Sequence, residues 1–112
     1  PAPVVAGSVE ADVCWLGETD LRVGDRLVLR HLSHDVTGTV SALDGRLDLG
    51  TLQSERTDSL ALNDIARVRI ELDRPVTATT YAEGRVTGSI VAIDPVSNRT
   101  VGALMITRLG AV

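Results

Sequence analysis

Apolar residues recur at every second position in several short segments of this chain, and no stretch shows the 3.6-residue period of an amphipathic helix. The clearest segment is 65–72, where the even positions are apolar and positions 67, 69 and 71 are charged. A period of two is typical of strands with one face in a core and the other in water. The pattern predicts strands at residues 8–16, 26–31, 35–43, 65–72, 85–93 and 100–107. Short strands at this spacing indicate an all-β barrel or sandwich.

Turn-forming residues separate these segments. The Asp-Gly pair at 44–45 and the Asp-Arg-Pro run at 73–75 are expected to end the strands before them, and 94–98 is expected to form a hairpin loop. The long connection 46–64 is expected to lie on the surface, with a short strand or turn of its own. Glycine also occurs inside strand patterns, where it permits bulges or a close approach of backbones, at positions 38, 88 and 102.

The length of the chain indicates one domain. It has 112 residues, of which 44% are hydrophobic and 23% charged, which is enough apolar surface for a real core. Residues 1–7 contain two prolines and end on a glycine, so we interpret them as a linker. We expect residues 8–107 to form the barrel domain and 108–112 to be a tail or the start of another linker.

All eleven basic residues are arginine, and this absence of lysine excludes several chemistries within the chain. A phosphate-binding loop needs a lysine at the phosphates, and Schiff-base chemistry needs a lysine amine. The net charge is −4 and aromatic residues make up 2% of the chain. Nucleic-acid binding, which uses a basic face and stacking aromatics, is therefore not expected.

One cysteine, Cys14, cannot form a disulfide within the chain. The sequence also shows no signal peptide and no long apolar run. We therefore expect a cytoplasmic location and no membrane partner.

A few residues could carry chemistry, but each of them also fits a structural role. His31, His34 and Cys14 could form a metal or nucleophile site, but zinc sites need more ligands at suitable spacing, so we interpret the histidines as surface residues. Trp15 ends an alternating segment on its apolar side and is expected in the core. We predict no catalytic, cofactor-binding or metal-binding residue. Five aspartates that could supply an acid–base pair are interpreted as turn residues instead: Asp44, Asp48, Asp58, Asp64 and Asp73.

The last two predicted strands are apolar on both faces, unlike the others. A small barrel buries only its inner face, so a second apolar face needs a cover. The alternation assigns Val91, Ile93, Leu104 and Ile106 to that second face. These four residues are our candidate interface.

Two stretches resemble a known family. Residues 62–76 (LNDIARVRIELDRPV) are similar to a stretch of the large, GTP-binding subunit of sulfate adenylyltransferase, and so are residues 85–94 (RVTGSIVAID) with 98–106 (NRTVGALMI). Weaker matches extend the resemblance over most of the chain. Ala66, Gly50 and Leu104 depart from the glycine, asparagine and glycine usual in the family.

The resemblance implies a fold and a role. The family is built like elongation factor Tu, and this chain is similar to its last domain, a six-stranded antiparallel Greek-key barrel. The parent enzyme makes adenosine phosphosulfate from ATP and sulfate, and some members continue into an adenylylsulfate kinase. The resemblance implies that GTP and Mg are bound by a GTPase domain outside this chain. The barrel would be non-catalytic, and its partners would be other domains of the same polypeptide and the small subunit.

Two alternatives remain at this point. The chain could be the matching barrel of a translation factor, which would bind tRNA. The net charge of −4 counts against this interpretation, because phosphate contacts need a positive face. It could also be a stand-alone protein-interaction module that uses the same barrel.

Overall fold

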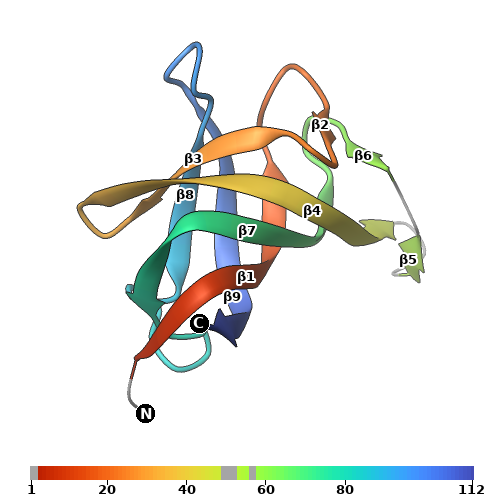
Figure 1. The fold of residues 1–112 in the computed structure, drawn as a ribbon. Coiled ribbons are helices and arrows are strands. Elements are labelled where there is room, and N and C mark those ends of the chain that lie inside the picture. Colours follow the sequence, from red (N-terminus) through yellow and green to blue (C-terminus); the bar gives the residue numbers. More distant parts are fainter. Residues whose placement is uncertain (1–2, 49–52, 56–57) are drawn as a thin grey trace.

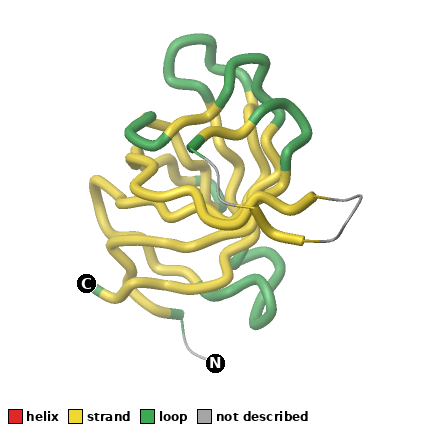
Figure 2. The backbone as a smooth tube through the Cα atoms, turned by 90° about the vertical axis from the view of Figure 1, so that its right-hand side faces the viewer, coloured by secondary structure: helices red, strands yellow, loops and turns green. Residues whose placement is uncertain are grey.

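The computed structural model describes residues 3–48, 53–55 and 58–112, and Figures 1 and 2 show a chain of strands joined by turns and loops. No helix in the described part of the chain is long and apolar enough to cross a membrane. The strands are β1 (Val4–Trp15), β2 (Leu21–Arg22), β3 (Arg26–His31), β4 (His34–Asp48), β5 (Gln53–Glu55), β6 (Ser59–Leu60), β7 (Ile65–Ala78), β8 (Ser89–Ile93) and β9 (Thr100–Ala111).

Six of these strands close into a barrel. They pair in the order β3-β8-β9-β1-β7-β4, every pair is antiparallel, and β3 also pairs with β4 to complete the ring. The predicted six-stranded antiparallel Greek-key barrel is therefore confirmed. Strand β5 extends the sheet beyond β4, and β2 pairs with β6 outside the barrel sheet. Closure removes the free sheet edges at which other chains could pair.

The alternating residues fill the barrel interior as expected. On β7, Val68 and Ile70 are 1% and 0% exposed, whereas Arg67 and Arg69, which alternate with them, point outward. Trp15 closes one end of the core with 4% of its surface exposed, and its indole Nε1 donates a hydrogen bond to the Thr19 carbonyl at 2.9 Å. The prediction that Trp15 is a core residue is confirmed.

The first strand begins earlier than the sequence predicted. Val4, Val5 and Ala6 pair with the end of β7, and Ala6 is fully buried, so part of the expected linker 1–7 is strand. This pairing exists because β7 continues past Pro75, which was expected to end it. Between the pairs Ala6–Val76 and Ser8–Glu71, β7 has four residues opposite one on β1. Pro75 lies in this bulge, where its missing N–H removes no ladder hydrogen bond.

Other strand limits also differ from prediction. β4 continues through the Asp-Gly pair at 44–45 to Asp48, because a bulge after Asp44 takes up Gly45, and β7 and β5 then supply partners. β8 starts at Ser89, since residues 85–88 form a turn, and β9 continues to Ala111 beside β1. The connection 46–64 contains β5 and β6, and Leu60 there is fully buried. Its residues 49–52 and 56–57 lie outside the described residues.

The predicted hairpin loop at 94–98 joins β8 to β9, and one side chain organises it. The Asp94 carboxylate accepts hydrogen bonds from the backbone N–H groups of Val96 at 2.7 Å and Ser97 at 2.9 Å. Asn98 adopts a left-handed backbone with φ of 61°. The hydrogen bonds from Ser97 and Val96 hold the pKa of Asp94 below its usual value.

This lowered pKa predicts a pH-dependent contribution to stability. A carboxylate whose pKa is lower in the folded state stabilises the fold above its unfolded pKa of about 4, and this contribution is lost as the pH falls through the folded pKa. We expect Asp94→Ala to melt at a lower temperature than the wild type at pH 7, and the gap to narrow below about pH 4. Thermal melts followed by circular dichroism at several pH values measure the gap, and a gap that stays constant down to pH 3 contradicts the prediction.

Candidate interaction surface

The structure divides the four candidate interface residues between two faces. Val91 is 39% exposed, whereas Ile93, Leu104 and Ile106 are 4%, 2% and 1% exposed. Leu104 and Ile106 are core residues, so their assignment to the outer face was wrong, and Ile93 is buried as well.

A bulge explains the error. Ala92 pairs with Gly102 and Ile93 pairs with Thr100, which leaves Val101 as an extra residue on β9. Val101 and Gly102 are consequently both buried, and the inward positions after them are 104 and 106 instead of 103 and 105. A shift of one residue exchanges the faces of a strand, and the alternation in the sequence carries no sign of it.

The residues that do face outward form a row across four strands. Val91 on β8 pairs with Ala103 on β9, Ala103 pairs with Cys14 on β1, and Cys14 pairs with Ile65 on β7. Residues directly opposite in an antiparallel pair lie on the same face with Cβ atoms about 5 Å apart. Met105, two positions along β9, is 43% exposed and adjoins the row. We call Val91, Ala103, Cys14, Ile65 and Met105 the outer apolar row.

Sequence reasoning found only Val91 of this row. Cys14 and Ile65 each belong to segments whose other outward positions are polar or charged, so neither looked like part of an apolar face. Only the register of β1 against β7 and β9 places them side by side.

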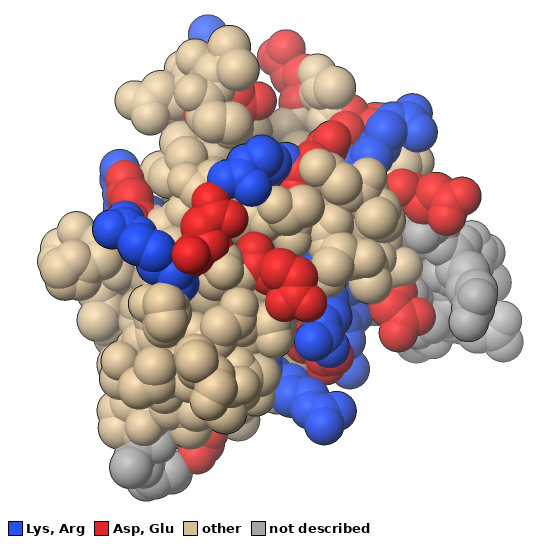
Figure 3. Space-filling view, in the orientation of Figure 1, with Lys and Arg blue, Asp and Glu red and all other residues tan. Residues whose placement is uncertain are grey.

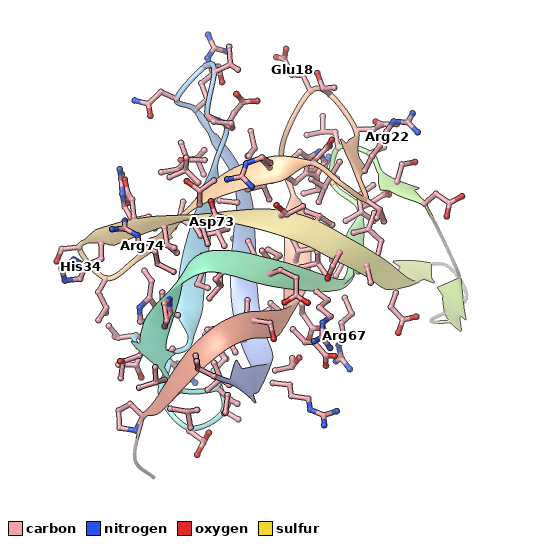
Figure 4. The ribbon with its side chains drawn as sticks, in the orientation of Figure 1. Glu18, Arg22, His34, Arg67, Asp73 and Arg74 are labelled. Carbon is pink, nitrogen blue, oxygen red and sulfur yellow. The ribbon has the colours of Figure 1, made fainter. Side chains whose placement is uncertain are left out.

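Charged residues border the outer apolar row. Arg67 on β7 donates to the Asp12 carboxylate on β1 at 3.1 Å, one row away, and Figure 4 shows Arg67 beside these strands. Beyond Val91, Arg30 on β3 donates to Asp35 at 2.9 Å and lowers the pKa of that carboxyl. Both pairs are about half exposed, so they contribute little to stability but keep these positions hydrated.

His31 and His34 are paired across the β3–β4 hairpin, whereas Cys14 lies on β1 between Ala103 and Ile65. His31 is 4% exposed, and its Nε2 hydrogen-bonds the Thr87 carbonyl at 2.8 Å, so the expectation of a surface position was wrong for this residue. Strand alternation turns it inward, where it ties β3 to the turn before β8. His34 is exposed at the tip of the β3–β4 hairpin (Figure 4). Within residues 3–48, 53–55 and 58–112, no three metal-ligating side chains gather.

Two of the aspartates considered for acid–base chemistry hold local structure through a hydrogen bond or an ion pair. Asp64 accepts from the Ala61 backbone N–H at 2.8 Å, and Asp73 forms an ion pair with Arg26. Asp44 and Asp58 are exposed. The side chain of Asp48 lies outside the described residues.

A cleft of about 640 Å³ opens at one end of the barrel, between the loop after β1 and the 94–98 hairpin loop. In Figure 3 this is the notch at the top of the molecule, with acidic side chains around it, and Figure 4 labels Glu18 at the tip of one loop. Buried Trp15, Leu21 and Leu27 form part of the lining.

Comparison with known proteins agrees with the barrel. Residues 8–107 match the family model described as GTP-eEF1A C-terminal domain-like. The chain superposes on a crystal structure of sup35 complexed with GDP with a TM-score of 0.84, covering 94% of this chain and 26% of that one. The sequence identity is 14%, so this likeness concerns the fold.

Curated relatives are closer in sequence. The sulfate adenylyltransferase subunit 1 of Laribacter hongkongensis is 35% identical over 95% of this chain, and that of Chromobacterium violaceum is 39% identical over 93%. The bifunctional enzyme CysN/CysC of Mycobacterium tuberculosis is 34% identical over 95%. The chain spans only 22% of the first two and 18% of the third.

The fold likeness agrees with the barrel seen here. The sequence matches confirm the resemblance noted from the two sequence stretches. The family model covers nearly the whole barrel, from within β1 to within β9. This chain belongs to the family of GTP-eEF1A C-terminal domain-like barrels, and within it resembles the barrel of sulfate adenylyltransferase subunit 1.

Proposed function

We propose that this chain is the non-catalytic C-terminal barrel of the GTP-binding subunit of a sulfate adenylyltransferase. The observation that carries the proposal is the 35–39% identity to subunit 1 sequences over 93–95% of the chain. The parent enzyme would be cytoplasmic and would form adenosine phosphosulfate from ATP and sulfate together with its small subunit.

The non-catalytic role is supported by the chemistry of the chain. No lysine is available for a phosphate-binding loop, so GTP and Mg²⁺ would be bound by a GTPase domain elsewhere in the polypeptide. The relatives are long enough to contain one, since this chain spans about a fifth of them. Polar groups that could act in catalysis, such as His31 and Asp94, already hold backbone atoms in place.

A tRNA-binding role is less well supported. Arg26, Arg30 and Arg67 each pair with a carboxylate on the barrel surface. The net charge of −4 also repels a negatively charged phosphate backbone, which disfavours binding to it. The likeness to sup35 is one of fold at 14% identity and adds no support for tRNA binding.

The test compares the native polypeptide that contains this chain with the 112-residue chain itself. With the small subunit added, we expect the native polypeptide to form adenosine phosphosulfate from ATP and sulfate in a GTP-dependent reaction. We expect the 112-residue chain to show neither this activity nor GTP hydrolysis. GTP hydrolysis by the 112-residue chain would refute the non-catalytic role, and a native polypeptide without adenylyl transfer would refute the enzyme assignment.

A further inference from the structure

Strand β1 consists of two parts that meet at Gly7. Residues 8–14 pair with β7 without interruption, whereas residues 4–6 pair with it only beyond the bulge that contains Pro75. The pairing of β1 with β9 shifts at the same glycine, so neither neighbouring strand supplies a partner for Gly7. We call residues 4–6 the N-terminal strap, which is the red start of β1 in Figure 1.

The N-terminal strap pairs with strand ends that lie outside the closed ring. Its partners are residues 76–78 of β7 and the end of β9, beside which the Val112 N–H donates to the Val5 carbonyl at 3.2 Å. β4 pairs with β7 only up to Leu72, and β8 pairs with β9 only up to Met105. The ring therefore closes without the strap, and the strap and these two strand ends hold one another.

The N-terminal strap contributes little to the hydrophobic core. Val4 and Val5 are 38% and 52% exposed. Ala6 is fully buried, but its side chain is a single methyl group, and it is not part of the main hydrophobic core. Opening the strap therefore costs little apolar burial, which is typical of segments that open locally. The residues that β1 contributes to the main core all follow Gly7: Val9, Ala11, Val13 and Trp15.

Gly7 has the surroundings of a hinge. A Cβ atom on Gly7 would meet only Val112 Cγ2, at 3.5 Å. Ser8, in contrast, is 9% exposed, and a Cβ atom on Gly110 would lie 2.1 Å from its Oγ, so Ser8 packs directly against the backbone of β9. A small residue next to a fixed one can absorb a change of chain direction. The fixed barrel thus begins at Ser8.

We propose that the N-terminal strap opens and closes at Gly7 as a unit of its own while the barrel stays folded. When closed, the strap fixes the direction in which the chain enters the barrel, between the ends of β7 and β9. When open, residues 4–7 become a linker with up to about 14 Å of reach. Opening also leaves the backbone of residues 76–78 as a free edge that another strand can pair with.

Two alanines on β1 provide a matched test. Ala6 and Ala11 are both 0% exposed, and each has a partner on β7 and on β9. A carboxylate at position 11 becomes hydrated only if the barrel unfolds, so it carries the full cost of a buried charge. A carboxylate at position 6 becomes hydrated when the strap opens. The loss of stability in Ala6→Asp therefore cannot exceed the free energy of opening the strap.

Urea titrations followed by Trp15 fluorescence compare the two variants. We expect Ala6→Asp to lower the urea midpoint by less than about a third of the loss in Ala11→Asp, or to keep a folded baseline where Ala11→Asp has none. An equal loss in the two variants, or an unfolded Ala6→Asp, overturns the proposal.

Hydrogen exchange measured by mass spectrometry separates strap opening from simple fraying of a chain end. Fraying deprotects residues 4–6 alone, whereas strap opening also deprotects residues 76–78 in the interior of the sequence. We expect both segments of the wild-type chain to exchange together, at least about 100-fold faster than residues 9–14. In Ala6→Asp both segments should lose protection while residues 9–14 keep it. Residues 76–78 that exchange as slowly as residues 9–14 in the wild type overturn the proposal.

Discussion

Val68→Asp is expected to leave the chain without a stable fold. Val68 is 1% exposed at the centre of β7, where it pairs with Ala11 on β1 and Leu43 on β4. A carboxylate there meets apolar neighbours, and an unpaired buried charge costs about 4 kcal/mol or more. Domains of this size are stable by only about 5–15 kcal/mol. Circular dichroism and Trp15 fluorescence in a urea titration should show a large loss of stability or an unfolded chain.

Thr77→Asp is the matched control for this substitution. Thr77 lies on the same strand but is exposed, so the same carboxylate remains hydrated there. We expect its urea midpoint to stay close to that of the wild type, because most surface substitutions change stability by less than about 0.5 kcal/mol. If Val68→Asp unfolds at the same urea concentration as Thr77→Asp, the assignment of Val68 to the inward face of β7 is wrong.

The inward face of β7 could be predicted because buried positions on a strand carry apolar residues and exposed positions carry polar ones. The alternation of residue types therefore shows which face is buried. The same logic predicted β3 with its exact limits and placed Trp15 in the core. It failed where one strand carries an extra residue opposite its partner. Val101 reverses the faces of β9, and the bulge around Pro75 lets β7 continue beyond an expected stop. A bulge is a property of two paired strands, so one strand's pattern does not reveal it.

The outer apolar row could not be predicted for the same reason. Its members lie far apart in sequence, and their adjacency depends on the register of three strand pairs. His31 shows a related limit. Its residue type favours the surface, but its position on β3 faces inward, where the Thr87 carbonyl satisfies its ring nitrogen. The family resemblance, in contrast, followed from local stretches and needed no register.

Gly88 tests how tightly the turn before β8 is packed. The sequence suggested close backbone approach at this glycine, and the structure places it at the end of a turn next to residues 80–81. A Cβ atom on Gly88 would lie 2.4 Å from the Thr80 carbonyl carbon and the Tyr81 nitrogen. These are backbone atoms, and Tyr81 N–H is itself bonded to the Ile106 carbonyl at 2.8 Å, so they cannot move aside alone.

We therefore expect Gly88→Ala to destabilise the chain by about 3 kcal/mol, at the upper end for overpacking, and to lower the melting temperature by more than about 10 °C. Gly7→Ala is the control, since its nearest atom, Val112 Cγ2, lies at an ordinary contact distance of 3.5 Å. Differential scanning calorimetry compares the two variants with the wild type. Equal melting temperatures for Gly88→Ala and Gly7→Ala would mean that the turn can shift. In that case the 2.8 Å hydrogen bond between His31 and the Thr87 carbonyl would not fix the position of this turn against β3.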